Sequence, residues 1–231
     1  MTEPAARAEA RWPRAVIFDL DGTLIDSAPD IAAAVNATLA EHGIEIDAAT
    51  ARHHLGDGAR KLIERVLAAH QVDADHDKLD RLTAVFTERY QAVPCRDSVV
   101  FDGACDALSA LQANDVKLAV CTNKPQAIAD RVVAHLGLDH YIDVVVGAGA
   151  YPLKPDPAPL YVCLEALDCD ADAAVYVGDM AVDRQAGHAA GLPVVLAEFG
   201  YAAGPVADLG ADGVISHWRG LDAAVAALRS H

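Results

Sequence analysis

Basic residues are scarce in this sequence. The 231-residue chain has 18 Lys and Arg residues against 34 Asp and Glu residues, which gives a formal net charge of −16. A surface of this sign repels phosphate backbones and anionic lipid headgroups. We therefore expect no general binding to nucleic acid or to membranes, while one local site can still accept an anionic substrate.

Paired cysteines and long apolar runs are missing as well. The five cysteines are scattered and never spaced as CxxC, which argues against a disulfide framework and against a zinc cluster. No stretch reaches the roughly 18 apolar residues of a membrane span, and Met1–Arg14 has no apolar signal-peptide core. Because 53% of the residues are apolar, the chain can bury a sizeable core. We predict a soluble cytoplasmic protein.

Short apolar runs that end abruptly in polar residues recur along the chain. The first is Ala15-Val16-Ile17-Phe18, which is followed by Asp19-Leu-Asp-Gly-Thr23. Runs of this kind, alternating with helix-like segments, are typical of buried parallel strands joined by helical crossovers. The sequence therefore predicts an α/β fold with a doubly wound parallel sheet. The later runs are Lys117–Cys121, Val144–Val146, Ala174–Val177, Pro193–Leu196 and Val214–Ile215.

About 100 residues separate the first two predicted strands, far more than the dozen or so that a crossover requires. Apolar positions recur there at helical spacing over Pro29–His42, Gly58–Ala69 and Asp77–Val93. We therefore expect residues 28–96 to form a small inserted helical domain. Residues 1–27 and 97–231 would form the α/β domain.

Polar residues follow the predicted strands. In a doubly wound sheet the carboxyl ends of the strands line one crevice, so these residues are expected to share a site. Carboxylates gathered there would raise one another's pKa and repel unless a cation neutralises them, and oxygen ligands suit Mg²⁺. The sequence thus predicts a magnesium site. The polar residues that follow the strands and would share this crevice are Asp19, Asp21, Thr122, Asn123, Lys154 and Asp179.

Asp19 and Asp21 are spaced for nucleophilic chemistry. Side chains two residues apart leave an extended chain on the same face, so both carboxylates can address one reacting atom. One can attack as a nucleophile while the other protonates the leaving oxygen and later deprotonates water. Gly22 allows a sharp turn beside the ligand, and Thr23 offers a hydroxyl or an amide. The alternative is that this segment merely ends a strand.

Two further residues and one pair of residues have two interpretations each. Thr122 combines a hydroxyl with the amides of a nearby helix start. It is either part of an anion-binding site or a plain N-cap residue. Lys154, flanked by prolines, is either the cation that holds a phosphate or a solvated surface charge. Asp179 and Asp183 lie four residues apart on one face of a helical turn, where they either bind metal and orient Lys154 or complement the helix dipole.

Four motifs of the sequence resemble, in their residues and in their order along the chain, those of the haloacid dehalogenase-like (HAD) hydrolase superfamily. The resemblance spans essentially the whole chain and implies a Rossmann-like core with a C1-type helical cap inserted after the first motif. Four tracts look most like those of phosphoglycolate phosphatases: Ala28–Asp30, His54–Arg60, Lys154–Leu160 and Phe199–Tyr201. The four motifs are Asp19-Leu-Asp-Gly-Thr-Leu24, Thr122-Asn-Lys124, Lys154-Pro-Asp-Pro157 and Gly178-Asp179 with Asp183.

The resemblance implies a role for each motif residue. Asp19 would be the nucleophile that forms an aspartyl-phosphate, and Asp21 the general acid and base whose backbone carbonyl also binds Mg²⁺. Asp179 would complete the protein's metal ligands, and Asp183 would orient Lys154 or the metal's waters. The transferring phosphate would be held by Gly22, Thr23, Thr122, Asn123 and Lys154.

The implied activity is Mg²⁺-dependent hydrolysis of a small phosphate monoester similar to 2-phosphoglycolate, by a monomer or a homodimer. The alternatives are a phosphosugar mutase, a phosphatase for another ester such as N-acetylmuramate 6-phosphate, and a non-catalytic protein that binds a phosphate ligand on this fold. In the cap, we hypothesise that Gly58, Arg60 and Lys61 contact the leaving group. The alternative there is a loop with solvated basic residues.

Overall fold

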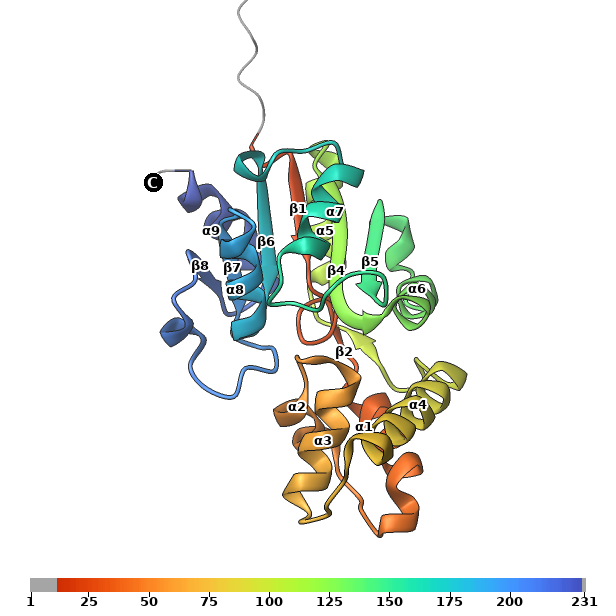
Figure 1. Cartoon of the computed structure of the whole chain (residues 1–231). Coiled ribbons are helices and arrows are strands. Elements are labelled where there is room, and N and C mark those ends of the chain that lie inside the picture. Colours follow the sequence, from red (N-terminus) through yellow and green to blue (C-terminus); the bar gives the residue numbers. More distant parts are fainter. Residues whose placement is uncertain (1–11, 230–231) are drawn as a thin grey trace, which may run out of the picture.

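A parallel sheet of six strands lies at the centre of the protein, whose computed structural model describes residues 12–229. The strand order is β5-β4-β1-β6-β7-β8, and every neighbouring pair is parallel (Figure 1). This arrangement confirms the predicted fold class. The strands are β1 (Ala15–Phe18), β4 (Lys117–Pro125), β5 (Val144–Ala148), β6 (Ala174–Gly178), β7 (Val194–Ala197) and β8 (Gly213–Ile215).

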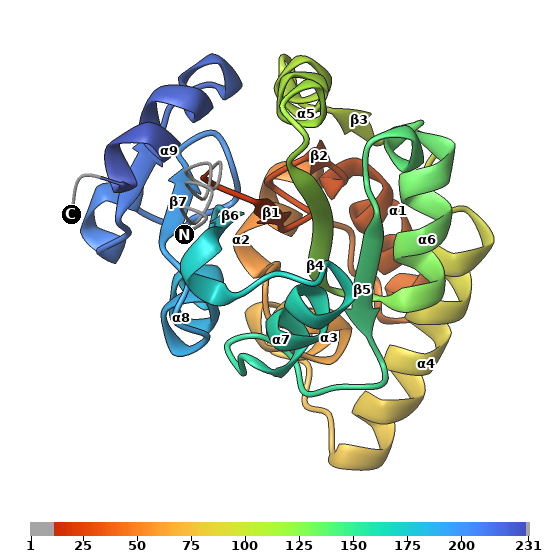
Figure 2. The ribbon, with the colours of Figure 1, turned by 90° about the horizontal axis from the view of Figure 1, so that it is seen from above.

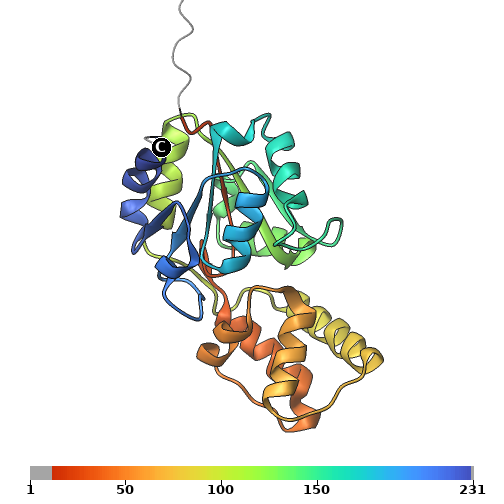
Figure 3. The ribbon, with the colours of Figure 1, turned by 60° about the vertical axis from the view of Figure 1, so that its left-hand side comes forward.

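Helices cover both faces of the sheet (Figures 2 and 3). Alternate residues of β1 point to opposite faces: Val16 and Phe18 pack with one group of helices, and Ala15 and Ile17 pack with the other. Because both faces are buried, strands β1, β6 and β7 are apolar throughout. The first group is α5 (Ala104–Ala113), α6 (Gln126–His135) and α9 (Leu221–Leu228), and the second is α7 (Ala158–Ala166) and α8 (Ala181–Ala189).

Four helices from the segment between β1 and β4 lie beyond the carboxyl end of the sheet (Figure 1), and we call this layer the cap. The chain reaches the cap through β2 (Ile25–Asp26) and leaves it through β3 (Val99–Val100), and these two strands pair antiparallel. The cap helices are α1 (Ala28–Leu39), α2 (Ala48–His54), α3 (Gly58–Ala69) and α4 (His76–Ala92).

Helix α2 was not predicted from the sequence. It has seven residues, of which only Ala51 is buried, so it shows no apolar periodicity. It begins at Asp47, whose side chain accepts a hydrogen bond from the Thr50 N–H at 2.7 Å. The helix predicted over Pro29–His42 ends at Leu39. Short 3₁₀ helices are η1 (Ala40–His42), η2 (Leu138–His140), η3 (Ala171–Ala173), η4 (Val206–Leu209) and η5 (Trp218–Gly220).

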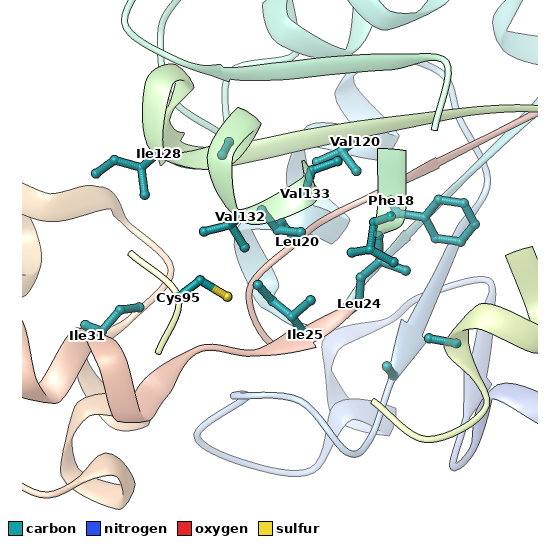
Figure 4. Close-up of a cluster of buried hydrophobic side chains, with 14 of the residues drawn as sticks. Phe18, Leu20, Leu24, Ile25, Ile31, Cys95, Val120, Ile128, Val132 and Val133 are labelled. Carbon is teal, nitrogen blue, oxygen red and sulfur yellow. The ribbon is translucent and has the colours of Figure 1, made fainter. Parts of the chain in front are cut away.

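The hydrophobic core extends from the sheet into the cap. One cluster of buried side chains contains Phe18 and Val120 from the sheet, Ile25 from β2, and Ile31 from α1 (Figure 4). Cys95, in the segment that leaves the cap, joins the same cluster. The burial of apolar surface that stabilises the sheet therefore also holds the two chain segments that carry the cap.

None of the helices among residues 12–229 has the length and apolar character needed to cross a membrane. All five cysteines are free thiols. Most of the segment Met1–Arg14, for which we expect no signal peptide, lies outside the described residues.

Candidate active site

Four of the predicted residues meet at the carboxyl end of the sheet. Asp19 follows β1, Thr122 lies near the end of β4, Asp179 follows β6, and Lys154 lies in the loop between β5 and α7. All four side chains are buried, with at most 8% of each residue exposed. Their convergence follows from the parallel topology, because each residue comes at the same end of its strand.

The Lys154 ammonium group lies between two carboxylates. Its Nζ atom is 2.9 Å from Asp19 Oδ1 and 2.7 Å from Asp183 Oδ1, and it also donates to the Tyr176 hydroxyl at 2.8 Å and to the Cys121 carbonyl at 3.0 Å. Burial disfavours the ammonium, but the Asp183 and Asp19 charges outweigh this effect and raise the pKa of Lys154. Lys154 is therefore a permanent buried cation.

Three buried carboxylates surround this lysine. Oxygen atoms of Asp19, Asp179 and Asp183 all lie within 4.8 Å of one another. Burial raises the pKa of Asp19 to about 7, with Lys154 opposing the shift and Asp183 adding to it. Burial, followed by the charges of Asp183 and Asp19, raises the pKa of Asp179 well above its usual value. In the absence of a further cation, Asp19 and Asp179 are driven to hold protons.

The donor set fits a divalent cation. With all three carboxylates ionised and Lys154 protonated, the charges sum to −3 + 1 = −2 within a buried site. Oxygen atoms this close together are the ligands that Mg²⁺ prefers. The Asp21 carboxylate is not part of this side-chain cluster.

Glycine makes room for Asp179 on two sides. A Cβ atom at Gly22 would lie 2.4 Å from Asp179 Oδ2, and a Cβ atom at Gly200 would lie 2.3 Å from Asp179 Cβ. Gly22 also has φ of +89°, a conformation that glycine adopts without strain. Both positions therefore require glycine if the Asp179 carboxylate is to stay where it is.

The Asp21 carboxylate is held by a second buried lysine. Lys124 Nζ lies 2.7 and 2.8 Å from the two oxygens of Asp21, and it also donates to the Tyr90 hydroxyl of α4 at 2.7 Å. The Ser27 hydroxyl donates to Asp21 Oδ1. Burial disfavours the charged form of Lys124, yet Asp21 and Tyr90 raise its pKa above the usual value. Burial raises the pKa of Tyr90 to about 12.

Two side chains predicted to hold phosphate make other contacts. The Thr23 hydroxyl is fully buried and donates to Asp179 Oδ1 at 2.8 Å. The Asn123 amide donates to the carbonyls of Gly56 and Lys154 at 2.9 and 3.0 Å, and its oxygen accepts from the Lys154 N–H at 2.8 Å. Both donor hydrogens of Asn123 are thus used. Its side chain bridges the cap to the lysine loop.

A pocket lies between the cap and the sheet, above Asp19 and Asp21. Of the three cap residues that we hypothesised to contact the leaving group, Gly58 lines this pocket, and Arg60 and Lys61 do not. Arg60 Nε is 2.9 Å from Asp80 Oδ1, and Lys61 Nζ is 2.7 Å from Glu64. The α3 helix turns both basic side chains to solvent. The lining residues are Asp19, Asp21, Ile31, Leu55, Gly56, Gly58, Ala59, Leu62, Phe86, Tyr90, Thr122, Asn123, Lys124 and Pro125.

Sequence reasoning assigned no role to Lys124, Tyr90 or Ser27. Tyr90 continues the apolar series Leu79, Leu82, Phe86 at helical spacing, so a polar hydroxyl at the end of that face was the available signal. Lys124 lies within a recognised motif but is 103 residues from Asp21 along the chain. Sequence spacing therefore carries no sign that these two residues pair.

The sequence profile of the haloacid dehalogenase-like hydrolases matches residues 16–197, which is most of the chain and includes every motif described above. The chain belongs to this family. The match covers the strands that precede Asp19 and Asp179 and the inserted cap.

Relatives within the family are named as phosphoglycolate phosphatases. The phosphoglycolate phosphatase of Rhodospirillum rubrum is 42% identical over 215 residues, which cover 90% of this chain and 89% of the relative. That of Cereibacter sphaeroides is 41% identical over 87% of this chain and 93% of the relative. A solved structure described as a predicted phosphoglycolate phosphatase from Haemophilus somnus has a TM-score of 0.82 at 26% identity, covering 91% of this chain and 96% of that one.

Proposed function

We propose that this protein is a Mg²⁺-dependent phosphatase that hydrolyses 2-phosphoglycolate. The observation that supports the chemistry most directly is the buried Lys154 between Asp19 and Asp183, in a cluster of three carboxylates whose charge reaches −2 when all three are ionised. The substrate is suggested by relatives about 40% identical over most of the chain that are named for it. The five free thiols suit a reducing compartment, and we place the enzyme in the cytoplasm.

In the proposed reaction, Asp19 attacks the phosphorus atom and the bond to the leaving oxygen breaks. Asp21 gives a proton to that oxygen, so the alcohol leaves neutral and the phosphate is held as an ester of Asp19. Asp21 then takes a proton from a water molecule, which attacks the phosphorus and frees Asp19. Lys154 and the Thr122 hydroxyl, both buried at this edge of the sheet, hold the phosphoryl oxygens.

The metal would be held by the carboxylates of Asp19 and Asp179 and by the backbone carbonyl of Asp21. When bound, Mg²⁺ supplies the positive charge that lets an anionic phosphate approach an anionic nucleophile. Asp183 binds Lys154 and accepts from the Met180 and Asp179 N–H groups at 3.0 and 3.2 Å, so it fixes both the lysine and the start of α8.

Lys124 offers a reason for the choice of substrate. It is the single Lys or Arg among the residues that line the pocket, and much of the cap side of that pocket is apolar, with Ile31, Leu55, Leu62 and Phe86. A leaving group that carries a carboxylate close to the phosphate can pair with this ammonium by replacing the Tyr90 hydroxyl, its one neutral partner among the described residues, whereas a neutral leaving group offers no charge in exchange. 2-Phosphoglycolate has its carboxylate one carbon away from the ester oxygen.

A substrate panel tests the proposed function. We expect 2-phosphoglycolate to be hydrolysed faster than N-acetylmuramate 6-phosphate, pyrophosphate, nucleoside monophosphates and hexose phosphates. Phosphate release should fall at least about 100-fold when EDTA removes the metal and return when MgCl₂ is added in excess. Release of no phosphate from any compound by the folded, Mg²⁺-supplied protein would contradict the proposal. Movement of phosphate between sugar positions without release would indicate a mutase.

The Lys124→Met variant tests how the leaving group is recognised. We expect its kcat/KM for 2-phosphoglycolate to fall about 10- to 100-fold more than its kcat/KM for 2-hydroxyethyl phosphate, which replaces the carboxylate by an alcohol. Both values will fall to some extent, because Lys124 also contacts Asp21. The ratio of the two values is therefore the measurement.

Lys61→Met is the matched control for this experiment, because it makes the same chemical change on an exposed residue of the cap. We expect it to leave the ratio at its wild-type value. An unchanged ratio in Lys124→Met would show that Lys124 does not contact the leaving group. A changed ratio in Lys61→Met would return the cap lysine to the list of specificity residues.

A further inference from the structure

Tyr201 fastens the chain segment that leads into the cap. Its hydroxyl accepts hydrogen bonds from the backbone N–H groups of Ser27 at 2.8 Å and Ala28 at 3.2 Å, and it donates to Asp26 Oδ1 at 2.8 Å. The second oxygen of Asp26 lies 2.5 Å from a guanidinium nitrogen of Arg52, in cap helix α2. Tyr201 itself is only 3% exposed and lies in the loop that follows β7.

The same residue contacts the carboxylate cluster through its backbone. The Tyr201 N–H donates to Asp179 Oδ2 at 2.7 Å, and the preceding Gly200 packs directly against Asp179. The other oxygen of Asp179 accepts from the Thr23 hydroxyl at 2.8 Å. Both oxygens of the proposed metal ligand are therefore bonded to groups that are tied to the same segment, residues 23–28.

These contacts form a continuous path between two parts of the molecule. It runs from Asp179 through the backbone and ring of Tyr201 to Asp26 and the Ser27 N–H, and on to Arg52 in the cap. All of its links are hydrogen bonds of 2.5 to 2.8 Å. No role in the phosphatase reaction described above uses Tyr201, although the tract Phe199–Tyr201 was singled out in the sequence.

We propose that Tyr201 is a positioning residue that couples binding of Mg²⁺ at Asp179 to the placement of the cap linker. This inference rests on the proposed function for the identity of the ion. Without a cation, Asp179 faces the carboxyl groups of Asp19 and Asp183 within the cluster, and its two oxygens are held by the Tyr201 N–H and the Thr23 hydroxyl. A bound cation would hold the Asp179 carboxylate in place, and the carboxylate would hold the Tyr201 N–H. The rigid ring would then hold the Tyr201 hydroxyl, which accepts from the Ser27 and Ala28 N–H groups. Coupling of this kind is reciprocal, so an ordered linker strengthens metal binding.

Amide hydrogen exchange measured by NMR, with MgCl₂ alone and no substrate, tests the coupling. In the wild type we expect exchange of the Ser27 and Ala28 amides to slow about tenfold when Mg²⁺ saturates the site. The amides of Thr50 and Lys78 serve as internal controls, since each is bonded to an N-cap aspartate elsewhere in the cap. Their exchange should not change.

Tyr201→Phe removes only the hydroxyl and keeps the N–H that donates to Asp179. We expect the Ser27 and Ala28 amides of this variant to exchange rapidly both with and without Mg²⁺. Calorimetry should still detect Mg²⁺ binding, with a dissociation constant raised about fivefold or more. Tyr161→Phe is the matched control, because Tyr161 is half-exposed and its hydroxyl donates to the Ala189 carbonyl of α8. It should behave as the wild type.

Three results would overturn the inference. The first is a wild type that binds Mg²⁺ without slowing of the Ser27 and Ala28 amides, a result that needs no variant and holds even if Tyr201→Phe does not fold. The second is a folded Tyr201→Phe variant that keeps the full Mg²⁺ effect. Either result, in protein that still releases phosphate with Mg²⁺, leaves the proposed function standing. The third, a wild type to which Mg²⁺ does not bind, would contradict the metal assignment as well.

Discussion

The Asp19→Asn variant is expected to fold and to release phosphate at least about 1,000-fold more slowly than the wild type, with saturating Mg²⁺ and 2-phosphoglycolate. The amide has nearly the shape of the carboxylate but is a very poor nucleophile toward phosphorus. Since Asp19 lies at the end of β1, 2.9 Å from Lys154 and within the carboxylate cluster, no other carboxylate of the cluster is placed to replace it without rearrangement. Phosphate release under single-turnover conditions is the measurement.

The fold of this variant should be as stable as that of the wild type. Burial raises the pKa of Asp19 to about 7, so the ionised side chain is disfavoured in the metal-free protein. Because the pKa of Asp19 is higher in the folded protein than in the unfolded chain, the wild-type side chain stabilises the fold most below about pH 4. This stabilisation is lost as the pH rises to about 7. At pH 8 the neutral amide removes a buried charge, and Lys154 keeps Asp183 as its partner. We therefore expect the melting temperature of the metal-free variant not to fall at this pH.

Asp139→Asn makes the same chemical change at an exposed carboxylate and should retain wild-type turnover. A folded Asp19→Asn protein with more than about a tenth of wild-type activity would refute the assignment of Asp19 as the nucleophile. A variant that melts far below the wild type at pH 8 would instead show that the Asp19 charge is needed to hold Lys154.

The sequence predicted the parts of this site that the chain topology determines. Asp19 and Asp179 each follow an apolar run, and parallel strands necessarily bring such positions to one edge. The bounds of α3 were predicted correctly for a similar reason, because its buried side chains repeat at helical spacing. Such features depend on local periodicity and on the order of elements, both of which are written in the sequence.

The contacts between the cap and the sheet could not be read in the same way. The pairing of Lys124 with Asp21 and Tyr90, and the bridge from Asn123 to Gly56, depend on how the cap docks. The position of Arg60 after a glycine turn predicts a contact with the substrate, yet α3 directs its side chain to Asp80. A shift of one residue along a helix turns a side chain by about 100°, which decides between pocket and solvent.

The Lys154→Met variant is expected to lose both activity and stability. Lys154 is 3% exposed, and its removal leaves Asp183, which is fully buried, without a cationic partner. Removal of one partner from a buried ion pair costs about 3–5 kcal/mol in the free energy of unfolding. Phosphate release should fall at least about 1,000-fold, because the transferring phosphoryl group loses its buried cation. Denaturant unfolding and a phosphate assay measure the two effects.

A second substitution separates the two effects. In Lys154→Met/Asp183→Asn the unpaired buried charge is gone, so we expect most of the lost stability to return. Activity should stay as low as in Lys154→Met, since the phosphoryl group still lacks its cation. Lys78→Met, in the cap, is the matched control for the loss of a lysine and should change neither quantity strongly. If activity returned together with stability, Lys154 would act by holding the fold, and the phosphate would have to be bound by other groups.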